Sequence, residues 1–324
     1  MLCFVTFAVL TACELGYFAL AKKLHIVDRP NERSSHHKPV LLGGGILFFL
    51  ALLFYSATHT LALPQLLIGA AILAVVSYAD DLHPLPSWLR LIAQLAALLI
   101  TFYGTINALD TWKILLVIIF FAGILNVYNF MDGINGMLAL YSIVVVGTFG
   151  YVQLFVRPFT DPMLIFTVLT ALVIFGFFNC RNKARCFSGD VGSIVMGLIV
   201  IYLLTTDVMA NPTAAPWESY LTFIIVFLAD GLLTIAKRFL NGRNILEPHR
   251  EHLYETLVND LKVPHLRVSV AYAFLQLLIN VGYFFVSDKT LYVFLWALVL
   301  TIGYGLFFFF VNRKKNSIDN NTKC

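Results

Sequence analysis

The chain has 324 residues, of which 60% are hydrophobic and only 12% are charged, and its mean hydropathy is +0.84. About a quarter of the residues of a soluble globular domain are charged, so this composition excludes an ordinary soluble enzyme. The net charge of +4 does not indicate nucleic-acid binding, because in a membrane protein the positions of the charges matter more than their sum. We therefore predict an all-α polytopic membrane protein, built from helices of about 20 apolar residues.

Eleven hydrophobic segments separated by polar breaks are candidate membrane spans. They lie near residues 2–21, 44–60, 62–79, 88–107, 111–130, 137–156, 162–179, 191–207, 217–236, 268–286 and 290–311. An odd number of spans places the two termini on opposite sides of the membrane. If the 22–43 loop is cytoplasmic, 19 of the 22 Lys and Arg residues lie on the inner side, which predicts an outside N-terminus and a cytoplasmic C-terminus.

This topology predicts a single transmembrane catalytic domain over residues 1–312 and a cytoplasmic tail over 313–324. Polar clusters occur where spans end, and all of them fall on the cytoplasmic side. We therefore expect one site at the inner membrane boundary, formed by loops 22–43, 80–90, 131–137, 180–190 and 237–267. Ionisable residues deep in the spans are few, mainly Glu14 and Asp230, which disfavours a transporter or flippase as the alternative function.

The Asp80-Asp81 pair follows the third span, where two adjacent carboxylates need a cation, a donor network or water. A solvated helix cap is the alternative interpretation. Arg90 follows shortly afterwards, and it can pair with these carboxylates or hold a substrate phosphate. A lone arginine at such a position is more often an anchor under the positive-inside rule, which is the alternative for Arg90.

The segment Asn126–Gly136 closes the fifth span with three amides, a carboxylate and two glycines. If the helix continues, one arc of about 120° carries the polar and small residues, namely Asn126, Asn129, Asp132, Gly133 and Gly136. Such a face offers oxygen ligands to a cation and close approach to the backbone. Helix packing is the alternative, since small and amide residues also join membrane helices.

Gly189-Asp190-Val191-Gly192-Ser193 opens the eighth span, where Asp190 can cap the helix or take part in binding a metal and a diphosphate. The longest loop contains His249, Arg250 and His252 beside acidic residues. An arginine between two histidines argues against a zinc site and favours an anionic diphosphate. A solvated amphipathic helix is the alternative for this loop.

The combination and order of these motifs resemble the polyprenyl-phosphate N-acetylhexosamine-1-phosphate transferases, within the glycosyltransferase 4 family. The motifs extend over residues 28–255, and 28–34 with the following glycines is similar to the branch that initiates bacterial lipopolysaccharide. The resemblance implies a UDP-N-acetyl amino sugar as donor, undecaprenyl phosphate as acceptor, Mg²⁺ or Mn²⁺, and UMP as a product. It also implies a multi-pass enzyme of the bacterial cytoplasmic membrane whose active site faces the cytoplasm.

The resemblance assigns roles to individual residues, with Asp190 as the principal metal ligand and Asn129 as a second. It implies catalytic roles for Asp80, Asp81, Asp132 and His249, and substrate binding by Asn126, Gly133, Asn135, Arg90, Arg250 and His252. Gly133 and Asn135 match positions that recognise the uracil, and the loop from His249 matches one that grips the diphosphate. Whether Asp80 removes a proton or only positions the acceptor is left open by the pattern.

The donor sugar and the glycan pathway are also left open, with GlcNAc, GalNAc, FucNAc and QuiNAc as candidates. Arg250 departs from the three-histidine form of the phospho-MurNAc-pentapeptide transferases, which remain an alternative function. Membrane lipid is an expected partner and nucleic acid is not, and a homodimer is kept as an alternative to a monomer. A scaffold with degenerate motifs is disfavoured, because every motif keeps its carboxylates.

Overall fold

The computed structural model describes residues 2–28, 39–60, 62–106, 110–244 and 250–321. Ten helical segments in these ranges are long and apolar enough to cross a membrane, which confirms the all-α polytopic class. They are α1 (Leu2–Leu24), α3 (Pro64–Leu82), α4 (Ser87–Ile106), α5 (Thr111–Phe130), α6 (Met137–Tyr151) with the π-helical η1 (Val152–Val156), α7 (Pro162–Asn179), α8 (Gly189–Ala210), the 3-10 helix η2 (Trp217–Ile224) with α9 (Ile225–Leu240), α11 (His265–Tyr283) and α12 (Lys289–Asn321). Short elements complete the fold: the antiparallel strands β1 (Val27–Asp28) and β2 (Val40–Leu41), α10 (Leu253–Glu255) and η3 (Thr256–Asp260).

The eleventh predicted span, 44–60, is the short helix α2 (Ile46–Thr58). Its 13 residues measure about 20 Å, less than the roughly 30 Å of a bilayer core. The glycines before it serve close packing: a Cβ on Gly45 would lie 2.3 Å from the Cα of Gly192 in α8. The backbone amide of Gly45 also donates to the carbonyl of Ser188 at 3.0 Å. Helix α2 therefore begins inside the bundle, against the start of α8.

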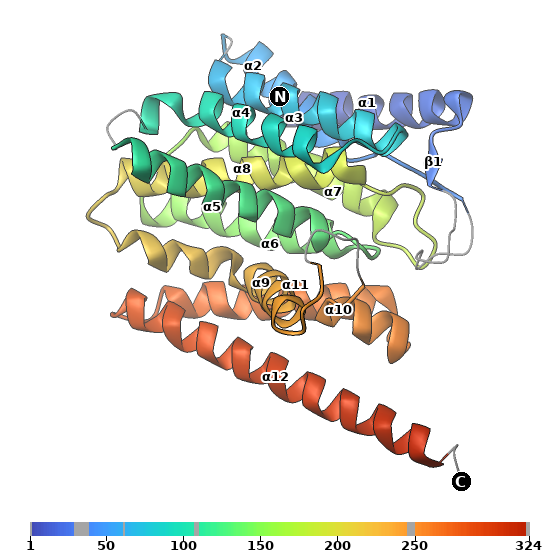
Figure 1. Cartoon of the computed structure of the whole chain (residues 1–324). Helices are drawn as coiled ribbons and strands as arrows, with labels where there is room; N and C mark the ends of the chain where they lie inside the picture. Colours follow the sequence, from blue (N-terminus) through green and yellow to red (C-terminus); the bar gives the residue numbers. More distant parts are fainter. Residues whose placement is uncertain (1, 29–38, 61, 107–109, 245–249, 322–324) are drawn as a thin grey trace.

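Helix α8 is the centre of the bundle, and it contacts α2, α3, α4, α5 and α6 (Figure 1). Its most apolar stretch is 83% buried, against 11% for α12, which lies along the edge of the bundle (Figure 1). Helix α12 also continues to Asn321, across the predicted start of the tail at residue 313. The motif at residues 189–193 thus opens the most enclosed helix.

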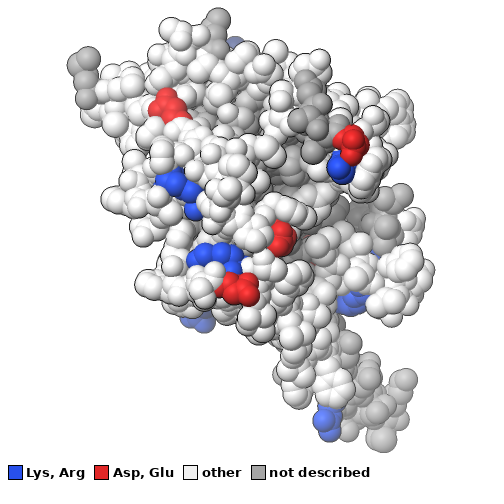
Figure 2. Space-filling view, turned by 90° about the vertical axis from the view of Figure 1, so that its left-hand side faces the viewer, with Lys and Arg blue, Asp and Glu red and all other residues white. Residues whose placement is uncertain are grey.

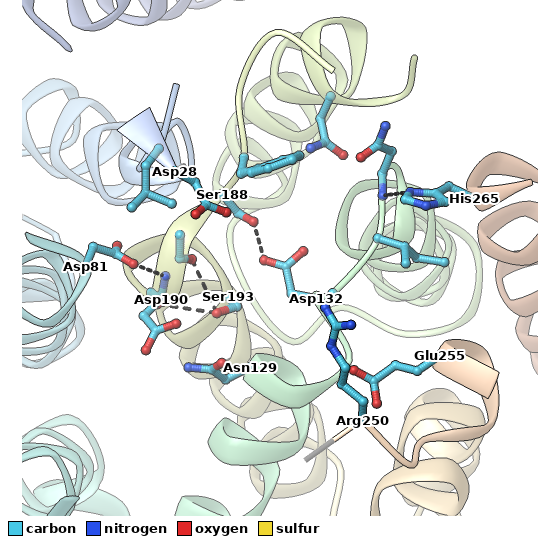
Figure 3. A pocket seen from close by; sticks show the side chains of 17 residues that line it. Asp28, Asp81, Asn129, Asp132, Ser188, Asp190, Ser193, Arg250, Glu255 and His265 are labelled. Carbon is cyan, nitrogen blue, oxygen red and sulfur yellow. Dashed lines mark hydrogen bonds between the residues drawn. The ribbon is translucent and has the colours of Figure 1, made fainter. Parts of the chain in front are cut away.

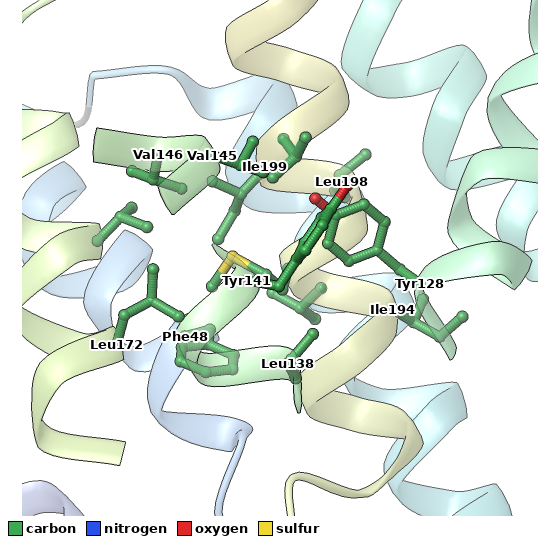
Figure 4. Packing of buried hydrophobic residues seen from close by; sticks show 14 of the residues in the cluster. Phe48, Tyr128, Leu138, Tyr141, Val145, Val146, Leu172, Ile194, Leu198 and Ile199 are labelled. Carbon is green, nitrogen blue, oxygen red and sulfur yellow. The ribbon is translucent and has the colours of Figure 1, made fainter. Parts of the chain in front are cut away.

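The predicted span 217–236 is broken between η2 and α9, which frees backbone groups within the membrane. Side chains of two other helices satisfy them: Gln276 accepts from the amide of Val226 at 3.0 Å and donates to the carbonyl of Thr222 at 2.8 Å. The amide of Phe227 donates to the hydroxyl of Tyr141 at 3.2 Å. Tyr141 lies in the packed apolar core (Figure 4). The break is therefore filled by neutral side chains.

The connections that carry the polar motifs meet at one end of the bundle (Figure 1). These are the end of α3, the α5–α6 link, the α7–α8 link and the segment before α11. Figure 2 looks onto the opposite end, where only scattered charged side chains reach the surface. The side of the membrane on which each end lies stays a prediction from the distribution of Lys and Arg.

Candidate active site

A cavity of about 340 Å³ opens at the end of the bundle where the motifs meet (Figure 3). Side chains far apart in the sequence line it and point into a common space. The residues from the predicted site that line it are Asp81, Asn129, Asp132, Gly133, Asn135, Asp190 and Arg250. The structure thus brings together parts of α3, α5, α8 and the loop before α10.

Asp81 caps the N-terminus of α8, so the Asp80-Asp81 motif directly contacts the motif at residues 189–193. Its Oδ1 accepts from the backbone amide of Asp190 at 2.8 Å and its Oδ2 from that of Val191 at 3.2 Å. The first amides of a helix have no partner within the helix, and a carboxylate there also suits the helix dipole. Gly189 has φ +69°, and a Cβ on it would lie 2.4 Å from Oδ2 of Asp81. Asp81 therefore fixes the backbone from which Asp190 projects.

The carboxylate of Asp190 faces the end of α5. The side-chain amide of Asn129 is its hydrogen-bond partner there, and Figure 3 shows the two side chains next to each other. Nη1 of Arg90 lies 3.8 Å from Oδ2 of this carboxylate. The two predicted metal ligands, Asp190 and Asn129, are thus adjacent in the cavity.

Helix α5 ends at Phe130, so Asn126–Gly136 does not form the continuous helical face that was considered from the sequence. The chain turns instead through Gly136, which has φ +83° and begins α6. The side chain of Asn135 donates to the carbonyl of Arg181 at 2.8 Å, and the amide of Gly136 donates to Oδ1 of Asn179 at 2.7 Å. These bonds fix the α5–α6 loop against the α7–α8 link.

Asn126 lies one turn before the loop and outside the cavity lining. Its side chain donates to Oε1 of Gln94 in α4 at 2.9 Å and to the carbonyl of Ala122 at 2.8 Å. The position agrees with the packing alternative for this residue. Its predicted contact with substrate would require these bonds to be replaced.

Asp132 lies opposite Asp190, and the hydroxyl of Ser188 donates to its Oδ2 (Figure 3). Burial raises the pKa of Asp132 well above its usual range. The nearby carboxylates of Asp190 and Asp81 raise it further, whereas the hydrogen bond from Ser188 opposes the shift. Across the cavity, burial raises the pKa of Glu255 to about 7. The site therefore concentrates carboxyl groups in a poorly solvated space that disfavours their charged forms.

The many carboxyl groups of the cavity are the observation that tests whether the site fits a metal ion. Among the residues that the structure describes, five acidic side chains line the cavity against one arginine, Arg250. Among the described ranges, no three His, Cys, Asp or Glu side chains lie close enough to hold a metal ion by themselves. Mg²⁺ is commonly bound by one or two carboxylates together with substrate phosphates. The oxygen donors Asp190 and Asn129 therefore fit Mg²⁺ or Mn²⁺ that is completed by a phosphorylated substrate.

Asp80 and Arg90 lie beside the cavity lining and bind each other. Nη1 of Arg90 lies 3.0 Å from Oδ2 of Asp80, and the amide of Leu85 donates to Oδ1 of Asp80 at 2.5 Å. The carboxylates predicted as a pair therefore have separate surroundings. Asp81 faces the start of α8, and Asp80 holds the turn that leads into α4.

Residues 250–255, in the described part of the loop before α11, reach the cavity through Arg250 and Glu255. Arg250 and Glu255 point into the cavity from the side opposite α3 (Figure 3). His252 is 1% exposed and lies outside the lining, with its Nδ1 3.5 Å from Oδ1 of Asp230. His249, predicted as catalytic, lies outside the described residues, as do residues 29–38 of the first loop.

Several lining residues were not among the predicted site residues. The polar ones among them include Asp28, Asn179, Ser188, Glu255 and His265. Ser188 directly precedes the motif at 189–193, so its position was a usable signal. His265 starts α11, and its Nδ1 lies 3.5 Å from the amide of Asn135. The sequence gives no signal that His265 and Asn135 are neighbours, because α11 and the α5–α6 loop are far apart in the chain and come together only in the folded structure.

Comparison with known proteins gives a consistent result. The model of glycosyl transferase family 4 matches residues 63–207. Decaprenyl-phosphate N-acetylglucosaminephosphotransferase of Mycobacterium leprae is 26% identical, with 77% of this chain and 75% of that protein covered. Undecaprenyl-phosphate alpha-N-acetylglucosaminyl 1-phosphate transferase of Salmonella typhi is 25% identical, with 74% and 71% covered. A probable undecaprenyl-phosphate N-acetylglucosaminyl 1-phosphate transferase of Bacillus subtilis is 24% identical, with the same shares.

Proposed function

We propose that this chain is a member of glycosyl transferase family 4 and that it transfers an N-acetylhexosamine 1-phosphate from a UDP-sugar to undecaprenyl phosphate. The products are UMP and a polyprenyl diphosphate-linked sugar. The observation that carries the proposal is the cavity where Asp132, Asp190 and Arg250 meet at the ends of membrane helices. Such a site can receive a soluble nucleotide sugar while a lipid phosphate approaches from the membrane.

The relatives support UDP-N-acetylglucosamine as the first donor to test, because three of them are named for N-acetylglucosamine. Donors with other N-acetylhexosamines differ at one hydroxyl or its orientation, and discrimination between them depends on individual hydrogen bonds in the pocket. A cell-envelope glycan whose synthesis starts on undecaprenyl diphosphate is the proposed pathway class.

The proposed reaction is an attack by an oxygen of the lipid phosphate on the β-phosphorus of the UDP-sugar. A new P–O bond forms, and the bond from the β-phosphorus to the bridging oxygen breaks, so UMP leaves with that oxygen. The second pKa of a phosphate monoester is about 6, and the acceptor is therefore already largely ionised at neutral pH. The main barrier is the approach of two anions, so general-base help is secondary.

The chain's own groups address this barrier by position and charge. Arg250 offers donors for a phosphate, and guanidinium groups suit phosphate geometry. Asp81 holds the start of α8, and Ser188 orients Asp132 toward the cavity. Mg²⁺ held by Asp190 and Asn129 would neutralise phosphate charge and align the groups for in-line displacement.

We also propose that the site faces the cytoplasm of a bacterial inner membrane. The support is the distribution of Lys and Arg, which favours the ends of the helices that carry the cavity. A transporter is disfavoured, because the broken helix between η2 and α9 is filled by Gln276 and Tyr141. A phospho-MurNAc-pentapeptide transferase is the nearer alternative, and the arginine at position 250 argues against it.

The direct test gives purified protein undecaprenyl phosphate, Mg²⁺ and a panel of UDP-sugars, including UDP-MurNAc-pentapeptide, and measures UMP release. We expect UMP with an N-acetylhexosamine donor and a lipid-soluble sugar product. Removing divalent cations with EDTA should stop release, and adding Mg²⁺ should restore it. Absence of UMP with every donor would remove the transferase proposal, and release only with the pentapeptide donor would reassign the substrate.

The contacts of Asp80 give a second prediction, on its role as a base or a positioning group. Because Asp80 binds Arg90 and the amide of Leu85, we expect Asp80→Asn to lower kcat/KM by about tenfold at every pH. The measurement is the pH profile of UMP release between pH 6 and 9 for both proteins. Recovery of the variant at alkaline pH would instead assign Asp80 as the base. Ser87→Ala is a control, because Ser87 accepts from Arg90 only at 3.4 Å.

A further inference from the structure

Asp230 is a buried carboxylate of α9 that the proposed reaction does not use. It is 4% exposed and lies outside the cavity lining, within the segment Trp217–Leu240 that crosses the membrane. A carboxylate in such a place is costly unless it is well hydrogen-bonded, so its partners indicate its purpose.

Two of those partners are backbone amides of the loop that reaches the cavity. Oδ1 of Asp230 accepts from the amide of Leu253 at 2.9 Å, and Oδ2 accepts from that of Tyr254 at 3.3 Å. The hydroxyl of Tyr272 in α11 donates to Oδ2 at 2.7 Å. Nδ1 of His252 lies 3.5 Å from Oδ1. One carboxylate therefore joins α9, α11 and the 250–255 segment.

The same segment contacts the α5–α6 loop through Tyr254. Its hydroxyl donates to the carbonyl of Phe130 at 2.8 Å. A Cβ on Gly133 would lie 2.2 Å from this hydroxyl, so Gly133 is needed for the close approach. Phe130 and Gly133 flank the loop that carries Asp132. Tyr254 thus joins the 250–255 segment, which carries Arg250, to the α5–α6 loop, which carries Asp132.

We propose that Asp230 is a positioning residue for the donor substrate: it holds the 250–255 segment against the α5–α6 loop, so that Arg250 faces the diphosphate of the UDP-sugar. His252 then acts through Asp230 as part of this anchor. The inference rests on the proposed function for the identity of the donor. The anchoring itself rests only on the contacts of Asp230 and Tyr254.

The expected effect separates the two substrates. Asp230→Asn keeps the size of the side chain but replaces one acceptor oxygen with a donor facing the amide of Tyr254 or the hydroxyl of Tyr272. We expect the KM for the UDP-sugar to rise by about tenfold. Losses of this size are typical when a residue that orients a ligand-binding side chain, without touching the ligand itself, is removed. The KM for undecaprenyl phosphate should change by less than about twofold, because the anchored segment supplies the donor side of the cavity.

A milder pair of variants guards against loss of folding. Tyr254→Phe removes the hydrogen bond to Phe130, and we expect it to raise the donor KM in the same direction. Tyr283→Phe is the matched control, since its hydroxyl pairs with Ser219 away from the cavity. It should leave both KM values unchanged.

Hydrogen–deuterium exchange provides a readout that does not depend on turnover. In Asp230→Asn, amides of residues 250–258 and 131–136 should exchange faster than in the wild type, with other segments unchanged. A double-mutant cycle with His252→Asn should show effects on donor KM that are less than additive, because both changes disrupt one anchor.

Three outcomes would overturn the inference: an unchanged donor KM, equal increases for both substrates, or unchanged exchange in the two segments. Additive effects of Asp230→Asn and His252→Asn would assign His252 a contact with substrate independent of Asp230. If the wild-type protein releases no UMP from any donor, the proposed function fails. In that case, unchanged exchange in Asp230→Asn would also disprove the anchoring role of Asp230. Faster exchange in both segments would still support it.

Discussion

Asp190→Asn is expected to lower sugar-phosphate transfer by about a thousandfold while the protein is produced and folded at normal levels. Asp190 projects into the cavity from the start of α8, next to Asn129 and 3.8 Å from Arg90. Its backbone amide, which Asp81 caps, is not altered by the change. The substitution therefore removes a charged oxygen ligand without removing the helix cap. The measurement is UMP release at saturating Mg²⁺, together with the yield of detergent-purified protein.

The matched control is Asp110→Asn. Asp110 forms an exposed ion pair with Lys113 at 2.6 Å and directly precedes α5, whose other end carries the cavity residue Asn129. Exposed pairs contribute about 0–1 kcal/mol, so activity and yield should both be retained. Near-normal turnover in Asp190→Asn would remove this residue from the proposed metal site. Loss of the folded protein in Asp190→Asn alone would show that its role is structural.

The sequence predicted the fold class and the meeting of the motifs for one reason. Membrane helices are long and apolar, so their ends are visible as breaks in hydropathy, and polar residues at several ends on one side must lie at the same level. Asp81, Asp132 and Asp190 were located in this way, and they line a single cavity. The family resemblance added the roles, which spacing alone does not supply.

Contacts between side chains from different helices could not be predicted in this way. Asp80 and Asp81 are adjacent in the sequence, yet one binds Arg90 and the other caps α8. Helical geometry sends neighbouring side chains about 100° apart, and only the packing of α3 against α4 and α8 determines which partner each meets. The same limit applies to Asp230, whose partners other than Thr234 of the same helix lie in two later segments.

Local breaks were a second source of error. Helix α2 is shorter than its predicted span, because the glycines before it pack against Gly192. The break between η2 and α9 falls inside an uninterrupted apolar run, where hydropathy gives no signal. Its existence depends on Gln276, which supplies the hydrogen bonds that the backbone loses. A continuous apolar segment therefore predicts a span but not a continuous helix.

The end of the bundle away from the cavity contains a buried ion pair between Arg157 and Asp207, which gives the last prediction. Asp207 in α8 is fully buried, and both of its oxygens accept from Arg157 at 2.8 Å. Arg157 follows η1 and also donates to the hydroxyl of Tyr220 at 3.1 Å. The pair thus joins the connection between α6 and α7 to the central helix.

Asp207→Asn should destabilise the protein by about 3 kcal/mol, because it leaves the Arg157 guanidinium largely buried without a counter-charge. The measurement is the thermal unfolding midpoint in detergent, with the UDP-sugar KM of the remaining folded protein as a second readout. The midpoint should fall, and the KM should stay at its wild-type value, since the pair is remote from the cavity. The double variant Arg157→Leu with Asp207→Leu should lose less stability than Asp207→Asn, because no unpaired charge remains. An equal or larger loss in the double variant would show that the pair itself stabilises the fold, beyond the cost of stranding one charge.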